Sequence, residues 1–273
     1  MHGSPQRLGD AFRVAPGTSV RLATMDPGAT LGFDKDAARD RTAADLDRLE
    51  VLQETVWAEH RHRILIVLQG IDTAGKDGAI RHLMRAFNAM GVRAVPFGVP
   101  VGPELAHDFL WRVHAQVPGD GEIVIFNRSH YEGVLAERIG ELVPEATWAR
   151  RYDAINAFER LLAVEGTTII KLFLHISPAE QLERLRARLA DPAKRWKFRR
   201  SDLRDRERWD VAIAAFDDAL TRCSTAEAPW YVIPSDHKWF RNLAVGTIVA
   251  DAIEALQPAF PEPEGLPADL PLS

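Results

Sequence analysis

The sequence predicts an α/β fold in which a parallel sheet of five strands carries helices on both faces. Three observations support this prediction. Short apolar runs alternate along the chain with amphipathic segments of helical length. The first run, residues 64–68, leads directly into a glycine loop and then a helical segment. Polar residues directly follow the third and fifth runs, as expected where strand ends face a ligand crevice.

The length fits one large globular domain or one domain with an appended arm. Hydrophobic residues make up 46% of the 273 residues, which suffices for a core. A single cysteine, Cys223, excludes an internal disulfide and favours the reducing cytoplasm. The apolar run before the loop is far shorter than the roughly 20 residues that cross a bilayer, and the N-terminus has no apolar signal core. We therefore expect a cytoplasmic protein with no membrane partner.

The residues before the glycine loop are expected to form an extension and one long helix. Residues 1–36 are rich in glycine, proline and aspartate and should run over the surface, where Arg13 and Arg21 either contact an anionic substrate or stay solvated. Residues 35–60 carry an apolar stripe at helical spacing. This helix would cover the sheet or meet a second subunit of a homo-oligomer, a dimer or tetramer.

The glycine loop has the pattern of a phosphate-binding loop. Gly70, Gly75 and Lys76 give G-x-x-x-x-G-K between a strand and a helix, so backbone N–H groups, the helix N-terminus and a mobile ammonium can face phosphates. Asp77 occupies the position of the serine or threonine whose hydroxyl usually holds magnesium. The carboxylate of Asp72 is a hard oxygen ligand and could bind magnesium in place of that hydroxyl. A chance glycine turn is the alternative.

The second strand is predicted at residues 92–99, a helix at 103–116 and the third strand at 122–126. The helix at 145–164 and the fourth strand at 167–175 come later in the chain. Between these two groups lies the polar segment described next.

The polar segment after the third strand reads Asn-Arg-Ser-His-Tyr-Glu over residues 127–132. The guanidinium of Arg128 can donate two parallel hydrogen bonds to a phosphate. Asn127 and Glu132 could hold a metal ion or orient the acceptor. A polar loop with helix-capping roles is the alternative interpretation.

A basic tract follows the fourth strand. Ser177 and Pro178 should begin a helix, with Glu180 as capping partner. From residue 184 to 200 the chain has eight basic residues and one acidic residue, although the whole chain has a net charge of −5. Residues 184–205 would form a lid over phosphates. A solvated helix face or a nucleic-acid surface are the alternatives.

The remaining elements are a helix at 205–221, the fifth strand at 229–234 and a closing helix at 239–256. Lys238 and Arg241, near the start of the closing helix, could point back into the crevice. The domain boundaries would then be an extension at 1–36, a domain at 37–257 and an irregular tail at 258–273.

Four blocks in this order resemble the polyphosphate kinase 2 family, over roughly residues 12–260. They are the glycine loop 70–78, the segment 126–132, the lid sequence 194–198 and the residues around Pro229 and Arg241. The resemblance implies a P-loop kinase fold of the thymidylate-kinase type with a helical lid. It also implies transfer of the terminal phosphoryl group of inorganic polyphosphate to a nucleotide, with Mg²⁺, or Mn²⁺ in its place.

The residues and the resemblance together define the expected site. Catalysis is expected from Asp72, Lys76, Arg128 and Glu132, and metal binding from Asp72, Asn127 and Glu132. Phosphate binding is expected from Gly70, Thr73, Ala74, Gly75, Lys76, Asp77, Gly78, Arg184, Arg188, Lys194, Arg195 and Lys197. Nucleotide binding is expected from Asp77, Arg81, Asn127, Arg128 and Glu132.

One departure from the family pattern bears on the acceptor. Many members carry aspartate where this chain has Asn127, and lack an acid where it has Glu132. The sequence is similar to the class III subgroup, whose members phosphorylate nucleoside mono- and diphosphates, here AMP and ADP, with ATP as a product. The departure favours a water-mediated metal contact at Asn127, or Glu132 sharing that role.

Two other functions fit the same motifs. An ATP-dependent nucleoside monophosphate kinase would use the same strand, loop and helix, although the missing hydroxyl after Lys76 speaks against it. A non-catalytic nucleic-acid-binding protein would use the basic tract. The acidic net charge argues against a nucleic-acid partner.

Overall fold

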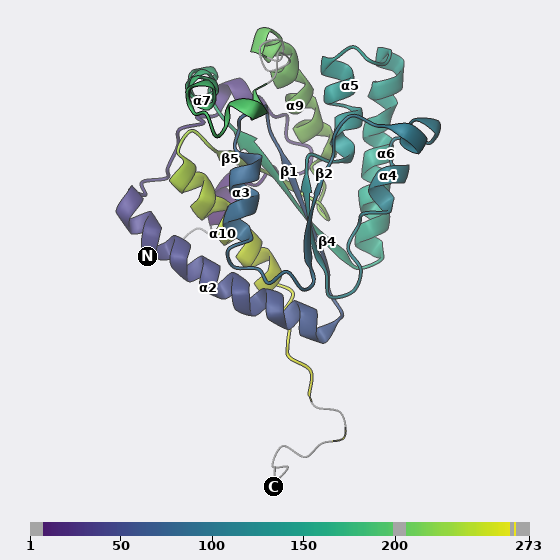
Figure 1. Ribbon diagram of the computed structural model, residues 1–273. Coiled ribbons are helices and arrows are strands. Elements are labelled where there is room, and N and C mark those ends of the chain that lie inside the picture. Colours follow the sequence, from purple (N-terminus) through teal and green to yellow (C-terminus); the bar gives the residue numbers. More distant parts are fainter. Residues whose placement is uncertain (1–7, 199–205, 263–264, 266–273) are drawn as a thin grey trace.

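The computed structural model describes residues 8–198, 206–262 and 265. Its core is a five-stranded sheet in the order β2-β3-β1-β4-β5, with every pairing parallel, which confirms the predicted α/β fold (Figure 1). After β1 the chain runs to β2 at one edge of the sheet. After β3 it crosses to β4 on the other side of β1. The ends of β1 and β3 therefore lie at the switch point, where open α/β sheets bind ligands. The strands are β1 Arg63–Gln69, β2 Val92–Pro96, β3 Ile123–Asn127, β4 Thr167–His175 and β5 Trp230–Pro234.

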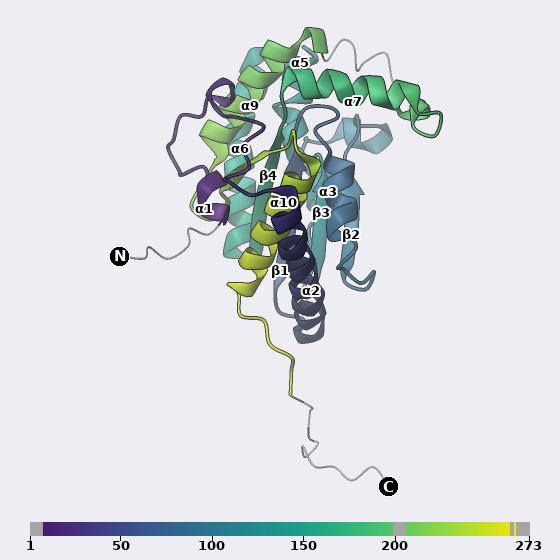
Figure 2. The ribbon, with the colours of Figure 1, turned by 90° about the vertical axis from the view of Figure 1, so that its left-hand side faces the viewer.

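Helices cover both faces of the sheet (Figure 2). Alternate side chains of β1 enter two separate cores: Ile64 and Ile66 lie in the one with α2, α3 and α10, and Leu65 and Val67 in the one with α6 and α9. The longer helices are α2 Lys35–Glu59, α3 Lys76–Leu83, α6 Glu145–Val164, α7 Pro178–Ala190, α9 Trp209–Cys223 and α10 Lys238–Glu254. The short helical elements are α1 Leu8–Phe12, α4 Trp111–His114, α5 Ala136–Ile139, η1 Leu22–Thr24, η2 Gly102–Ala106, η3 His130–Gly133 and η4 Arg195–Lys197.

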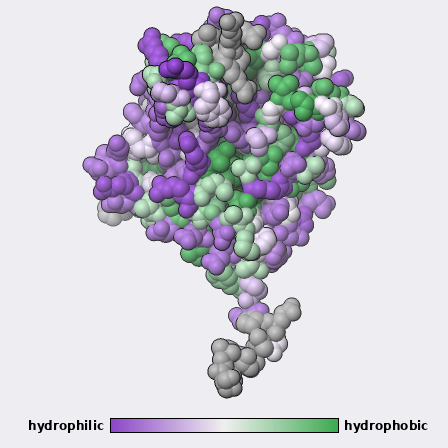
Figure 3. Space-filling view, viewed as in Figure 1, coloured by the Kyte–Doolittle hydropathy of each residue, from purple (hydrophilic) through white to green (hydrophobic). Residues whose placement is uncertain are grey.

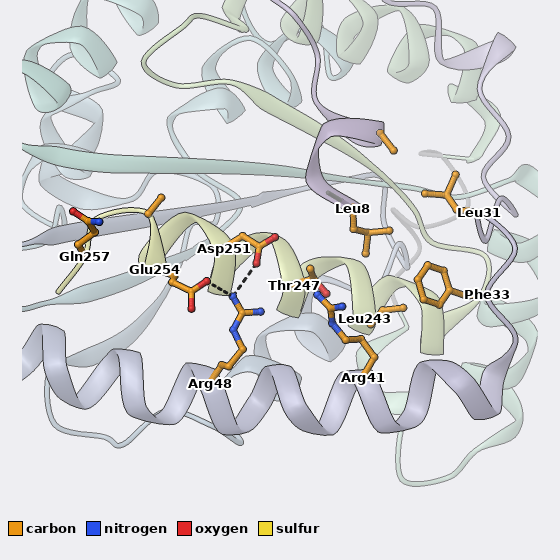
Figure 4. A pocket seen from close by; sticks show the side chains of 12 residues that line it. Leu8, Leu31, Phe33, Arg41, Arg48, Leu243, Thr247, Asp251, Glu254 and Gln257 are labelled. Carbon is orange, nitrogen blue, oxygen red and sulfur yellow. Dashed lines mark hydrogen bonds and ion pairs between the residues drawn. The ribbon is translucent and has the colours of Figure 1, made fainter. Parts of the chain in front are cut away.

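The long helix α2 covers the protein's own core. Its apolar residues Leu49 and Val56 are buried in the core that contains α10. Arg48 joins the two helices through Asp251, at 2.9 Å, and Glu254, at 2.8 Å (Figure 4). The residues in Figure 4 line a cavity of about 890 Å³ between α1, α2 and α10. Of the two predicted roles of this helix, the structure confirms the covering role, and the subunit contact stays a prediction.

Two expectations, one about a helix and one about the N-terminal segment, were wrong. The helix expected at 103–116 is split into η2 and α4, because Asp108 accepts a hydrogen bond from the N–H of Leu110 at 2.9 Å, a turn that competes with a helix. The N-terminal segment does more than run over the surface. Val14 and Leu22 are buried, and the N–H of Val14 donates to the carbonyl of Trp230 in β5 at 2.8 Å.

The other boundaries differ in detail. The helix expected to begin at 205 begins at Trp209, and residues 199–205, the end of the predicted lid, lie outside the described residues. Most of the predicted tail also lies outside them.

Among the described residues, no helix is long and apolar enough to span a membrane. Exposed hydrophobic side chains gather over the region of α5 on the face seen in Figure 3.

Candidate active site

The phosphate-binding loop joins β1 to α3 through backbone conformations that most residues avoid. Gly75 has φ +107° and lies so close to Arg241 that a Cβ would come within 2.0 Å of its Nη1 atom. Thr73 has φ +66°, which is rare for a β-branched residue. Strained residues of this kind persist where the surroundings fix them, and they cluster at functional sites.

Lys76 folds back onto the loop. Its Nζ donates to the carbonyls of Gly70, at 2.6 Å, and Ile71, at 3.3 Å. Burial, and next the positive charge of Arg128, lower the pKa of Lys76 to about 8. The ammonium is therefore held by neutral carbonyls in a place that favours an anionic partner.

Arg184 fixes the loop to the neighbouring strand end. Its Nη1 donates to the carbonyls of Thr73 and Ala74, at 3.0 and 2.8 Å, and its Nη2 to those of Ser235 and Asp236. Its Nε donates to Glu180 at 2.7 Å, so all five N–H donors of the guanidinium are used. Arg184 lines the site as predicted, but its donors hold the backbone of the loop.

The start of α7 differs from the expected capping box. The Ser177 hydroxyl accepts from the N–H of Glu180 at 3.1 Å, as predicted. The Glu180 carboxylate turns instead to Arg184, and Asp236 accepts from the N–H of Ser177 at 2.8 Å. This capping bond joins α7 to the end of β5.

A basic cavity of about 420 Å³ lies beside the loop. In Figure 2, α7 lies across the top of the sheet, above the start of α3. Lys238 and Arg241 line the cavity, which confirms that they point into the crevice. Eight basic and two acidic side chains line it: Lys76, Arg81, Arg184, Arg188, Lys194, Lys197, Lys238, Arg241, Asp72 and Asp77.

Arg241 shows how strongly this cavity lacks negative charge. Its side chain is buried, and its Nε and Nη2 donate hydrogen bonds to the neutral amide of Asn242. Burial, and then the charges of Arg184 and Arg81, lower the pKa of Arg241 to about 10. An anion in the cavity would relieve this repulsion.

The two carboxylates of the loop contact lid cations. Asp72 lies 3.3 Å from Arg188, and Asp77 lies 3.2 Å from Lys197. Asn127 donates its amide N–H to Asp77 at 3.0 Å. Burial opposes ionisation of Asp77, but the hydrogen bonds from Asn127 and Lys197 leave its pKa below the usual value.

A second cavity, of about 560 Å³, lies on the other side of Asp72. Arg128 and Glu132 line it together with apolar side chains, and Asp72 is the residue that both linings share among the described residues. Glu132 accepts from Gln69 at 3.1 Å and pairs with Arg128 at 3.2 Å. The apolar part of the lining consists of Ile71, Val99, Leu135, Ala136, Ile139, Leu142, Ala212 and Phe216.

Several predicted site residues lie elsewhere than one of their predicted roles suggests. Arg81, predicted for the nucleotide, lines the basic cavity, as does Asp77, which was predicted for both phosphate and nucleotide. Gly70 lines the second cavity, and Ala74 and Asn127 line neither. Arg195, predicted for phosphate, is absent from the lining of either cavity, and its Nε donates to the carbonyl of Leu189 at 2.9 Å. Arg195 lies in η4, and this hydrogen bond joins its side chain to the end of α7.

The sequence did not predict the buried side chains that support residues 127–132, the segment that contains Arg128. Glu159 of α6 and Lys171 of β4 form a buried ion pair at 2.6 Å beneath it. Lys171 is the one charged residue in the otherwise apolar run of β4 before His175, which was the available signal. Gln69, at the end of β1, was also missed.

The donor set suits a divalent cation that is shared with substrate. Within the described part of the chain, no group of three or more His, Cys, Asp or Glu residues could hold a metal ion. Asp72 and Glu132 line the same cavity, however. Mg²⁺ is usually bound through one or two carboxylates, with phosphate oxygens and waters completing its shell, so these two residues fit it.

Comparison with known proteins places this geometry in context. A family model described as polyphosphate kinase 2 matches residues 32–261. The chain is 51% identical over 255 residues to the AMP/ADP-polyphosphate phosphotransferase of Meiothermus ruber, covering 93% of this chain and 96% of that protein. It is 36% identical to the ADP-polyphosphate phosphotransferase of Rhodopseudomonas palustris, covering 92% and 91%.

A solved structure agrees with these sequence matches. The crystal structure of polyphosphate kinase 2 from Arthrobacter aurescens superposes with a TM-score of 0.92 and 41% identity, over 96% of this chain and 94% of that one. The similarity therefore includes both cavities, and it extends over nearly the whole length of each relative.

Proposed function

The chain belongs to the polyphosphate kinase 2 family, and we propose that it transfers the terminal phosphoryl group of inorganic polyphosphate to AMP and ADP. The observation that supports this most directly is the arrangement of the two cavities. A cationic cavity suits a long polyanion, and a half-apolar cavity beside it suits a nucleotide. They meet at Asp72.

The donor would bind in the basic cavity. The cavity has more cations than a nucleoside triphosphate could neutralise, which favours an inorganic polymer. Lys76 would exchange the carbonyls of Gly70 and Ile71 for phosphate oxygens, and the N-terminus of α3 would add N–H donors. Arg188, Lys194 and Lys197 would approach from the lid.

The acceptor would bind in the second cavity, with its base on the apolar lining and its phosphates towards Arg128. An oxygen of the acceptor phosphate forms a bond to the terminal phosphorus, and the phosphoanhydride bond to the polymer breaks. The polymer leaves one unit shorter and keeps the electron pair of the broken bond. Arg128 and Lys76 would stabilise the charge of the transferred group.

Kinases of this family generally depend on a divalent cation, and we propose Mg²⁺, or Mn²⁺ in its place, on Asp72 and Glu132. When bound, the cation would neutralise phosphate charge. We assign Asn127 the role of holding Asp77, because its amide already donates a hydrogen bond to that carboxylate. We further propose a cytoplasmic location, which the free, buried thiol of Cys223 supports.

The test is an assay of the purified chain with Mg²⁺, polyphosphate and either AMP or ADP. We expect ADP and ATP to form from AMP, and ATP from ADP. A parallel reaction replaces polyphosphate with ATP as the donor to AMP. Failure to form product from polyphosphate would refute the proposal, and equal or faster transfer from ATP would indicate a nucleoside monophosphate kinase.

A further inference from the structure

A buried polar network lies beneath the segment that carries Arg128 and Glu132. The side chains of Glu159 and Lys171 are 1% and 0% exposed, and their charged groups lie 2.6 Å apart. Lys171 Nζ also donates to the Tyr131 hydroxyl, at 2.9 Å, and to the carbonyl of Cys223, at 2.6 Å. Two charges are thus removed from water and satisfied by partners on four elements.

The network contacts the segment at two consecutive residues. Glu159 Oε1 accepts from the Tyr131 hydroxyl at 2.9 Å and lies 3.0 Å from Nε2 of His130. Tyr131 is fully buried, and its ring packs on Trp230 with ring centroids 4.8 Å apart. His130 and Tyr131 stand between Arg128 and Glu132 in the chain, so the network fixes the link between the two site residues.

Arg128 needs such support because its backbone is strained. Its φ is +64°, in the left-handed region that arginine seldom adopts. On one side its N–H donates to the carbonyl of Leu68 in β1 at 3.0 Å. On the other side the Ser129 hydroxyl oxygen accepts from the N–H of Tyr131 and from Gln69, both at 3.2 Å. The strained residue is therefore held by Leu68 and Gln69 of β1 and, through Tyr131, by the network.

A buried ion pair is weak support for stability, since apolar residues of similar volume often replace one at no cost. Stability alone is thus a poor account of Glu159 and Lys171. On the basis of the proposed function, we infer that Glu159 and Lys171 are positioning residues for phosphoryl transfer. Through Tyr131 and His130 they hold the backbone that directs Arg128 and Glu132 into the acceptor cavity.

The main test is the double variant E159Q/K171M, which removes both charges and keeps the side-chain lengths. We expect a folded protein with kcat reduced about 10- to 100-fold, because small displacements of positioned groups cost that much. The KM for polyphosphate and the affinity for tripolyphosphate should stay within twofold, since the donor cavity does not include this segment. The control R48M/D251N removes an ion pair between α2 and α10 and should keep wild-type kcat.

A milder variant covers the case in which the double variant does not fold. Y131F keeps the ion pair but removes the hydroxyl that joins it to the segment, and we expect kcat to fall several-fold with unchanged tripolyphosphate affinity. A folded variant of either kind with wild-type kcat would overturn the inference. So would an equal loss of tripolyphosphate affinity, which indicates a general structural role. An inactive wild-type chain would instead count against the proposed function.

Discussion

At the residue scale, the site is made of cations held in places where they are short of negative charge. Lys76 donates to two backbone carbonyls, and the guanidinium of Arg241 is buried beside other cations. Both groups have a lowered pKa because burial disfavours their charged forms. The energy of this arrangement is recovered when a polyanion enters, so affinity for phosphate should depend on the protonation of Lys76.

The affinity for tripolyphosphate should fall as the pH rises above about 8. Free Lys76 loses its proton near that pH, whereas a bound phosphate raises its pKa, so binding must supply the proton. The affinity then decreases by up to about tenfold per pH unit above 8. Calorimetric titration of the wild type from pH 7 to 9.5 measures this. In K76M the affinity should be lower and almost independent of pH, and a flat wild-type curve would contradict the prediction.

Arg184 should be intolerant of even a conservative change. Lysine has three donors without the planar fork, so R184K leaves several of the carbonyls of Thr73, Ala74, Ser235 and Asp236 without a partner. We expect a loss of about 2–4 kcal/mol in the free energy of unfolding. Urea denaturation measures it, with R186K, an exposed position on the same helix, as the control. A loss no larger than that of the control would show that the fork is dispensable.

At the element scale, α7 and η4 carry lid residues that contact the phosphate-binding loop. Arg184 and Arg188 stand one turn apart on α7, and Arg188 contacts Asp72. Lys197 of η4 contacts Asp77. These lid cations contact the loop carboxylates, and a bound phosphate would compete with the carboxylates for the cations.

Lys197 should therefore act on the donor and not on the acceptor. We expect K197A to raise the KM for polyphosphate several-fold and to leave the KM for ADP almost unchanged. The reason is that Lys197 lines the basic cavity but not the second cavity. The control is R186A, which removes an equal charge from the basic tract outside both cavities. Steady-state kinetics with each substrate varied in turn decides this. Equal effects on both substrates, or none, would remove Lys197 from donor binding.

The sequence predicted the elements that have strong periodicity. The bounds of α6 and β4 agree with the expected 145–164 and 167–175, because long apolar patterns define them. The split between η2 and α4 depends on one side-chain hydrogen bond of Asp108, which no periodicity reveals. The boundary between the basic cavity and the second cavity, and with it the places of Arg81 and Arg195, depends on tertiary contacts that a motif does not contain.

At the scale of the whole molecule, the packing of α3 on α10 buries a histidine. His82 of α3 is buried against α10, and a Cβ on Gly246 would lie 3.5 Å from its Nε2 atom. That Nε2 has no hydrogen-bond partner among the residues that the structure describes. Burial, and then the charges of Arg85 and Arg241, lower the pKa of His82 to about 4.

The protein should consequently lose stability in mild acid through His82. In the unfolded chain this histidine takes up its proton near pH 6.5, but in the folded protein only near pH 4. The unfolded state binds more protons between these values, so stability falls as the pH decreases through that window. For His82 alone, the loss between pH 7 and 4.5 is about 2 kcal/mol.

Urea denaturation of the wild type and H82N at both pH values isolates this contribution. H82N is destabilised at pH 7 because it packs less well, but the further loss on going to pH 4.5 should be about 2 kcal/mol smaller than in the wild type. H107N removes an exposed histidine and should retain the wild-type loss. If H82N loses as much as the wild type, the acid sensitivity lies in other groups, and α3 can accept a charged imidazole against α10.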